Sequence, residues 1–266
     1  MTRILTSIIG IPVLIYLIKF APFLVFFVVA FIAMLLMVYE YLGLVRASGR
    51  PVFSWLTYVF AAAIALAFYF RWPADSFVPL FALPALTVAL FSKHNPESGF
   101  FAAGFTVFGA LYVGGLMGYL VGVRSLDPAG DTGSDLLMML FVIIWAGDIF
   151  AFVFGKTMGR HKLAAVSPNK TVEGAIAGLV FSILSAVACR FLFAAQVPVL
   201  HSALLGAVVG ALGQIGDLCE SIVKRAAGVK DSGNIIPGHG GILDRVDSLL
   251  FGAPAMYYYC LFFLHP

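Results

Sequence analysis

Charged side chains are scarce in this sequence. Only 11% of its 266 residues are Asp, Glu, Lys or Arg, whereas 62% are hydrophobic. An average soluble domain has about 25% charged residues and about half apolar residues. The mean hydropathy is +1.02. So few charges cannot cover so much apolar surface in water, which excludes a soluble globular protein. The net charge of +3 is too small to indicate a nucleic-acid partner.

Cysteines are also few, and polar linkers are lacking. Cys189, Cys219 and Cys260 are scattered in or beside apolar runs, which favours buried thiols over a disulfide or a metal site. No polar stretch interrupts the chain, so we expect residues 1–266 to form a single membrane domain. Within it, we predict that residues 1–135 form a scaffold of amino-terminal spans and that residues 136–266 form the catalytic half.

The sequence is rich in apolar runs, and a membrane-spanning helix needs about 20 such residues. We therefore predict an all-α polytopic integral membrane protein with about nine transmembrane helices. The first and fourth runs are shorter than the others. The runs are Ile4–Ile18, Pro22–Leu42, Phe53–Phe70, Phe77–Phe91, Phe100–Val123, Leu136–Phe154, Val172–Phe193, Val199–Val223 and Ser248–Leu264.

The basic residues indicate the orientation of these spans. With the amino end cytoplasmic and the carboxyl end outside, twelve of the 16 basic residues fall on inside loops. Cytoplasmic loops are enriched in Lys and Arg, which supports this topology. Asp127, Asp131 and Asp135 then fall on an outside loop, where we expect solvated turn residues. Glu40 and Arg46 flank the end of the second run, where we expect anchors at the membrane interface.

Two features of the second half bring charge into or beside the apolar runs. Asp148 lies within a run, and a carboxylate there costs roughly 2.5–3.5 kcal/mol. We predict a functional role for it, with a structural salt bridge as the alternative. After a basic loop, Ser167 or Thr171 is a candidate cap for the next helix, with Glu173 in its first turn. Alternatively, Lys170, the hydroxyls and the first helical amides form a phosphate site.

The stretch from Asp217 to Asp247 concentrates the chemistry, with five acids, four bases and one histidine between two apolar runs. Spacings of three and four place Asp217, Glu220, Ser221 and Lys224 on one helix face. Asp244 and Asp247 share a face if the last helix begins near Gly241. Carboxylates at two helix ends are the hard oxygen ligands that Mg²⁺ prefers, which suits phosphoryl-group chemistry.

Between these helices, Gly238, Gly240 and Gly241 surround His239. The glycines allow close backbone approach to a polyphosphate, and neighbouring basic side chains favour the same ligand. For His239 we favour a loop or phosphate contact over a role as general acid or base. The alternative for the whole stretch is a charged hairpin that only tethers two spans.

These residues resemble the pattern of the phosphatidate cytidylyltransferase (CDP-diacylglycerol synthase) family. The resemblance is firm from about Trp145 to Asp247. Asn169 stands where the family pattern has a lysine, which weakens the case for a required positive charge at this position. The matching residues are Asp148, Phe154-Gly155, Ser167-Pro168, Lys170-Thr171, Glu173-Gly174, Ser221, Lys224-Arg225, Lys230-Asp231, Gly233, Ile236-Pro237, His239-Gly240-Gly241 and Asp244-Arg245-Val246-Asp247.

The resemblance implies an enzyme that condenses CTP with phosphatidic acid to CDP-diacylglycerol and pyrophosphate. It implies Mg²⁺, with K⁺ as a second cation, and a homodimer, whose contacts we expect in residues 1–135. We expect the inner (plasma) membrane, with the active site facing the cytoplasm. Asp217 and Asp244 are the implied metal ligands, supported by Asp247, and Lys224 and His239 complete the predicted catalytic residues. The predicted substrate-binding residues are Asp148, Ser167, Lys170, Thr171, Glu173, Ser221, Arg225, Lys230, Asp231, Gly240, Gly241 and Arg245.

Two other functions stay open at this point. A CTP-dependent polyprenol or dolichol kinase would use the same nucleotide and metal but would transfer a phosphoryl group to an alcohol. An ion-coupled transporter would also place acids in glycine-broken spans. No inverted repeat is visible, however, and the charges gather at one face.

Overall fold

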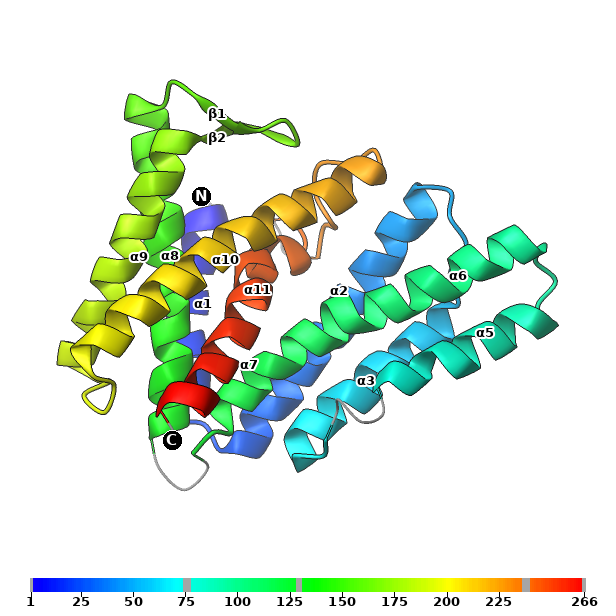
Figure 1. Cartoon of the computed structure of the whole chain (residues 1–266), viewed down its shortest axis with the longest axis horizontal. Coiled ribbons are helices and arrows are strands. Elements are labelled where there is room, and N and C mark those ends of the chain that lie inside the picture. Colours follow the sequence, from blue (N-terminus) through cyan, green and yellow to red (C-terminus); the bar gives the residue numbers. More distant parts are fainter. Residues whose placement is uncertain (1, 74–77, 128–130, 236–239, 265–266) are drawn as a thin grey trace. The chain divides into compact units, whose positions relative to one another are not determined.

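The computed structural model describes residues 2–73, 78–127, 131–235 and 240–264. The described chain is helical apart from its turns and one short hairpin (Figure 1). Its elements are α1 (Thr2–Lys19), α2 (Phe23–Ala47), α3 (Ser54–Phe70), η1 (Val78–Phe81), α5 (Ala82–Phe91), α6 (Pro96–Gly109), η2 (Ala110–Gly115), α7 (Leu116–Arg124), α8 (Thr132–Met158), β1 (Lys162–Ala164), β2 (Ser167–Thr171), α9 (Val172–Leu192), α10 (Val199–Ala226), α11 (Leu243–Tyr259) and η3 (Cys260–Leu264).

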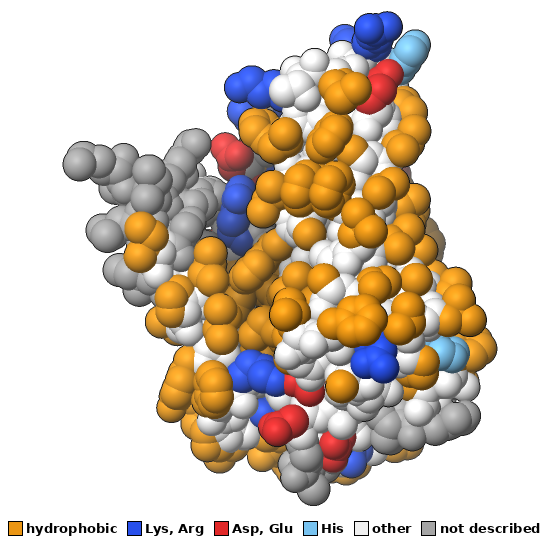
Figure 2. All heavy atoms as spheres, turned by 90° about the vertical axis from the view of Figure 1, so that its left-hand side faces the viewer, with side chains coloured by type: hydrophobic (Ala, Val, Ile, Leu, Met, Phe, Trp, Pro, Cys, Tyr) orange, Lys and Arg blue, Asp and Glu red, His pale blue; other side chains and the backbone are white. Residues whose placement is uncertain are grey.

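The predicted class of all-α membrane protein is confirmed. Six helices of the described chain are long and apolar enough to cross a membrane. Three shorter apolar helices, Gly10–Lys19, Ser54–Phe70 and Val78–Phe91, lie on the remaining predicted runs. On the face drawn in Figure 2, hydrophobic side chains cover broad areas of the helices, and charged side chains gather in separate groups. Such a surface suits a lipid environment.

The chain divides into two compact units that alternate along the sequence. Unit 1 consists of Met1–Ser7, Leu24–Gly122 and Val223–Arg245, and unit 2 consists of Ile8–Phe23, Val123–Ile222 and Val246–Pro266. The stretch Val223–Arg245, which carries much of the predicted chemistry, therefore clusters with the amino-terminal helices. The predicted division at residue 135 concerns function, which these units do not test, so it stays a prediction.

Unit 1 has a core of aromatic and aliphatic side chains, and buried hydrogen bonds add to its packing. Phe60 and Phe81 stack with their ring centroids 4.2 Å apart. The Tyr41 hydroxyl donates a hydrogen bond to the Phe105 carbonyl at 2.8 Å, which joins α2 to α6. The buried Tyr41 hydroxyl thus finds a partner inside the unit, as burial in an apolar environment requires.

Unit 2 is packed through small residues. A β-carbon added to Gly174 of α9 would lie 2.6 Å from the Ala151 carbonyl oxygen of α8, and one added to Gly178 would lie 2.9 Å from the Gly147 carbonyl oxygen. These distances are too short for any side chain, so the two backbones touch. Small residues four apart allow such close approach between membrane helices. The Ser182 hydroxyl adds a hydrogen bond to the Ile143 carbonyl at 3.1 Å.

The segment between α8 and α9, expected to be a loop, forms an antiparallel hairpin. Lys162 lies opposite Thr171, and Ala164 lies opposite Ser167. Glu173 holds the hairpin at its base. Its carboxylate accepts hydrogen bonds from the backbone amides of Arg160 (3.0 Å) and His161 (3.3 Å), and it contacts the His161 ring at 2.6 Å. Glu173 lies in the first turn of α9, as predicted.

Asp135 differs from its prediction as a solvated turn residue. It lies in the first turn of α8 and is 7% exposed. Its carboxylate pairs with the Lys19 ammonium and accepts a hydrogen bond from the Gln196 amide at 3.2 Å. The expectation is wrong because the chain brings a distant cation to this helix start, and a paired carboxylate can be buried there.

Candidate active site

Several predicted site residues of unit 2 lie around Asp217 on α10. The Lys170 ammonium, at the end of the hairpin, pairs with the Asp217 carboxylate. Both side chains stay accessible, with 29% of Lys170 and 30% of Asp217 exposed. Asp148 of α8 interacts electrostatically with Asp247, Asp217 and Lys170. Asp217, Asp247 and Lys170 therefore lie within electrostatic range of Asp148 in this unit.

Small residues and backbone contacts position this cluster, which we call the Asp217 cluster (Asp148, Lys170, Asp217 and Asp247). A β-carbon on Gly216 would lie 2.7 Å from the Asp247 carbonyl oxygen, so α10 and α11 touch next to both aspartates. Gln214, three residues before Asp217 on α10, donates a hydrogen bond to the Ala175 carbonyl of α9 at 3.1 Å. The Asp247 carboxylate also accepts the Ser248 amide at 2.7 Å. Contacts of α10 with α9 and α11 thus position the cluster.

A second ion pair, in unit 1, joins the end of α10 to the start of α11. The Lys224 ammonium donates to Asp244 Oδ1 at 2.7 Å. Asp244 Oδ2 accepts three hydrogen bonds of 2.9 Å, from the Ser232 amide, the Ser232 hydroxyl and the Gly241 amide. The Asp244 side chain is 4% exposed and that of Lys224 is 13% exposed. We call Lys224, Ser232, Gly241 and Asp244 the Asp244 cluster.

The loop that carries this cluster begins and ends with glycines in the left-handed region. Gly228 has a φ of 70° and follows the end of α10, where the Val229 amide donates to the Lys224 carbonyl at 3.0 Å. Gly240 has a φ of 83° and lies three residues before α11 begins at Leu243. Positive φ costs glycine little, which explains both residues by backbone geometry.

Glu40 is a contact residue of this loop that the sequence analysis missed. It lies on α2, is 2% exposed, and accepts the amides of Ile242 at 2.9 Å and Leu243 at 2.8 Å. It also contacts the Ser232 hydroxyl at 3.2 Å. The expectation of an anchor at the membrane interface is therefore wrong, because the carboxylate points into unit 1. Its signal in the sequence was a lone acid inside an apolar run, the same signal that singled out Asp148.

The remaining predicted site residues lie on surfaces or brace the backbone. Thr171 caps α9, accepting the Gly174 amide at 3.2 Å, which confirms one of the two candidate caps. Glu173 holds the hairpin, and Arg225 donates to the Val229 carbonyl at 3.3 Å. Ser167 and Ser221 are half-buried, whereas Lys230, Asp231 and Arg245 are exposed. His239 lies outside the described residues.

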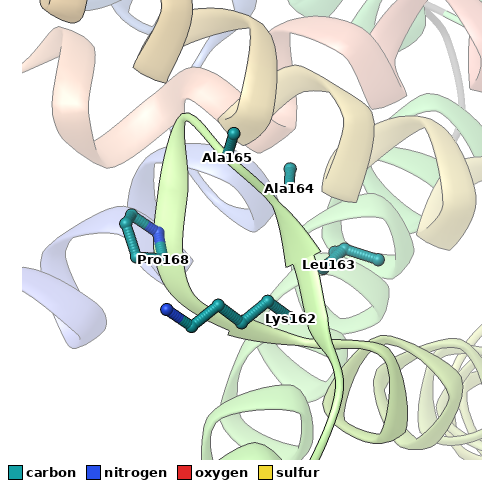
Figure 3. A pocket seen from close by; sticks show the side chains of 5 residues that line it. All are labelled: Lys162, Leu163, Ala164, Ala165 and Pro168. Atoms are coloured by element: carbon teal, nitrogen blue, oxygen red, sulfur yellow. The ribbon is translucent and has the colours of Figure 1, made fainter.

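An open pocket of about 430 Å³ lies at the hairpin (Figure 3). It is lined by Lys162, Leu163, Ala164, Ala165 and Pro168. Lys162 reaches toward the side of the hairpin that holds Pro168. The exposed Asn169 follows on β2. None of the lining residues belongs to the predicted site, so this hollow is distinct from the two charged clusters.

The carboxylates suit a hard divalent cation by their chemistry. Asp148, Asp217 and Asp247 offer oxygen donors on three helices of unit 2, and a positive charge, Lys170, already binds Asp217. Oxygen donors of this kind are what Mg²⁺ binds. No three His, Cys, Asp or Glu side chains form a ready-made ligand group within the described ranges. The metal ligands therefore stay a prediction.

Residues 1–263 match the family model described as the cytidylyltransferase family. The chain is 42% identical over 156 residues to the phosphatidate cytidylyltransferase of Bacillus subtilis, covering 58% of this chain and 57% of the relative. It is 35% identical over 250 residues to that of Synechocystis, covering 85% and 84%, and 40% identical over 174 residues to that of Staphylococcus aureus, covering 64% and 63%.

The matched residues include both charged clusters. The family model extends over nearly the whole chain, and so includes α2 as well as the segments that carry the charged residues. A match of this extent rules out an isolated motif shared by chance. The chain belongs to the cytidylyltransferase family.

Proposed function

We propose that this protein is a CTP:phosphatidate cytidylyltransferase, which forms CDP-diacylglycerol and pyrophosphate from CTP and phosphatidic acid. The observation that carries the proposal is the match of residues 1–263 to the cytidylyltransferase family, together with relatives named phosphatidate cytidylyltransferase at 35–42% identity. The aligned segment covers 57% of the Bacillus subtilis protein and 84% of the Synechocystis protein.

The reaction needs charge compensation more than proton transfer. A phosphate oxygen of phosphatidic acid bonds to the α-phosphorus of CTP, and the bond from that phosphorus to the bridging oxygen of pyrophosphate breaks. The attacking phosphate is already an anion at neutral pH, so no strong base is required. The main barrier is the approach of two polyanions, which positioned cations lower. Lys170, Lys224, Arg225 and Lys230 are the basic side chains that we propose for this role.

We propose that Asp217, Asp244 and Asp247 hold Mg²⁺, with K⁺ as a second cation. Bound Mg²⁺ would supply charge compensation for the phosphates. The support is the oxygen chemistry of the donors and the ion pairs that already neutralise two of them, Lys170 with Asp217 and Lys224 with Asp244. At the accessible Asp217, a bound cation would compete with Lys170 and would leave that lysine available to a substrate phosphate.

We also propose nine membrane spans, with the amino end cytoplasmic, the carboxyl end outside and the active site facing the cytoplasm. Twelve of the 16 basic residues fall on the inside loops of this topology. The bacterial relatives favour the plasma membrane. CTP is soluble and phosphatidic acid is a lipid, so both meet at the cytoplasmic interface. A reporter fused after Pro266 should be active outside the cell, and a cytoplasmic reporter would overturn the topology.

A homodimer is the assembly that we propose, with contacts through the amino-terminal spans. The family resemblance supports it. Single-molecule counting of labelled protein in nanodiscs checks this, because a monomeric and fully active population would contradict it.

The test of the activity is an assay of purified protein with CTP and phosphatidic acid, with and without Mg²⁺. CTP labelled in cytidine and CTP labelled in the γ-phosphate are compared. We expect the cytidine label to enter lipid only when Mg²⁺ is present. Entry of the γ-phosphate label into a polyprenol would indicate a lipid kinase. Ion flux into vesicles without consumption of CTP would indicate a transporter.

A further inference from the structure

We propose that Glu40 of α2 is a positioning residue for Asp244. The proposal rests on the proposed function only for its activity readout. Glu40 lies 192 residues or more from its hydrogen-bond partners in the loop, so it acts between distant parts of the sequence. Glu40 and its partners in the loop all belong to unit 1.

The contacts of Glu40 are with the backbone that begins α11. Its two carboxylate oxygens accept the Ile242 amide at 2.9 Å and the Leu243 amide at 2.8 Å. The first amides of a helix have no partner within the helix. A carboxylate there binds them with charge-assisted hydrogen bonds and interacts favourably with the helix dipole. Asp244 is the next residue in the chain, so Glu40 fixes the turn from which Asp244 extends.

A second route from Glu40 to Asp244 runs through Ser232. The Ser232 hydroxyl lies 3.2 Å from Glu40 Oε2 and 2.9 Å from Asp244 Oδ2. A hydroxyl has one proton, which can serve only one of these carboxylates at a time. The two acids therefore share a donor, and movement of one changes the hydrogen bonding of the other.

Two glycines make this contact possible. A β-carbon on Gly233 would lie 2.7 Å from Glu40 Oε1, and one on Gly241 would lie 2.6 Å from Glu40 Oε2. Both are shorter than real β-carbon contacts, so the loop backbone closes directly around the carboxylate. Gly241 was predicted to allow close approach of the backbone to a polyphosphate. In unit 1 the group that the backbone approaches is a side chain of the protein itself.

The substitution Glu40→Gln tests the proposal with little change of shape. The glutamine amide nitrogen is a donor and would face donors of the loop, so at least one hydrogen bond is lost and the loop shifts. We expect kcat/KM for CTP to fall about 100-fold at saturating Mg²⁺, the scale of an ångström misplacement at a reaction centre. Gly233→Ala should reproduce the effect from the other side of the contact.

The matched control is Tyr41→Phe, on the next residue of α2. It removes a buried hydrogen bond to the Phe105 carbonyl and leaves the loop untouched. We expect Tyr41→Phe to lower the melting temperature and to keep kcat/KM within about twofold of the wild type, because an active-site residue is not displaced. An equal loss of kcat/KM in both variants would reduce Glu40 to an ordinary core residue and overturn the proposal.

Limited trypsin digestion tests the same idea without any assay of activity. Lys230 is exposed on the loop, and Lys93 is exposed between α5 and α6. In Glu40→Gln, cleavage at Lys230 should accelerate about tenfold relative to cleavage at Lys93, since a released loop opens without global unfolding. In Tyr41→Phe the ratio should not change. An unchanged ratio in Glu40→Gln would overturn the proposal. If the wild type does not consume CTP, the proposed function fails, and the digestion still tests Glu40.

Discussion

The two charged clusters are built from the same kind of ion pair but in opposite ways. The Asp244 cluster is buried: Asp244 is 4% exposed and receives three hydrogen bonds besides that of Lys224. The Asp217 cluster is accessible, with about 30% of both paired side chains exposed. Burial makes the first geometry costly to disturb, whereas solvent access allows the second to exchange partners. Asp244 is therefore a fixed acid, whereas Asp217 is able to exchange its partner.

The largest expected effect is the loss of either aspartate. In Asp244→Asn and in Asp217→Asn we expect kcat to fall about 1,000-fold, the scale of removing one group that compensates charge in the transition state. The clusters should differ in stability. Asp244→Asn leaves Lys224 buried with its partner uncharged and should cost about 3 kcal/mol. Asp217→Asn should cost at most about 1 kcal/mol because water solvates Lys170.

Thermal unfolding in detergent and turnover of CTP measure these two quantities on the same samples. Glu97→Gln, an exposed acid at the start of α6, is the control and should change neither. Near-normal activity of either aspartate variant would remove that residue from the proposed metal ligands. Equal destabilisation of both would contradict the contrast between the clusters.

The next effect concerns the paired lysines. Lys224→Ala and Lys170→Ala should each raise the KM for CTP about tenfold, because one charge-assisted contact to a phosphate is lost. Only Lys224→Ala should also lower the melting temperature, since it leaves Asp244 without its ion-pair partner. Lys93→Ala is the control for a lysine that is exposed and outside both clusters. A KM that stays at the wild-type value would exclude that lysine from CTP binding.

A smaller effect should follow from crowding the backbone behind the Asp217 cluster. In Gly174→Ala the new methyl group would meet the Ala151 carbonyl oxygen at 2.6 Å. We expect α8 and α9 to separate at a cost of about 1–3 kcal/mol in unfolding free energy. Gly104→Ala is the matched control, because nothing lies within 4 Å of its β-carbon. It should be neutral or stabilising by at most about 1 kcal/mol. Equal melting temperatures of the two variants would argue against close α8–α9 contact.

The smallest effect is expected at the helix cap beside Lys170. Thr171→Ala removes the acceptor for the Gly174 amide and should cost about 1 kcal/mol. Thr171→Ser keeps the hydroxyl and should retain most of the stability. The cap orients the end of β2, which carries Lys170. We therefore expect Thr171→Ala to raise the KM for CTP only modestly. A large loss of turnover in Thr171→Ser would instead indicate direct contact of the Thr171 methyl group with substrate.

Local patterns predicted the helices well and the turns poorly. Each predicted apolar run falls on a helix, because hydrophobic length is a property of consecutive residues. The segment before α9 was expected to be a loop, yet it is a hairpin held by Glu173. Asp135 was expected in water, yet it pairs with Lys19. Both errors concern charged side chains whose partners come from another segment of the chain.

The sequence by itself determined the membrane class, the family resemblance and most of the charged residues of the two clusters. These follow from composition, hydrophobic runs and fixed spacings, which need no three-dimensional information. Only the tertiary structure decided that Asp244 is buried and Asp217 accessible, and that Glu40 closes the loop before α11. A carboxylate's burial and partners depend on which backbone amides and cations the packed helices bring to it. That arrangement joins residues about 200 positions apart, and no local spacing contains it.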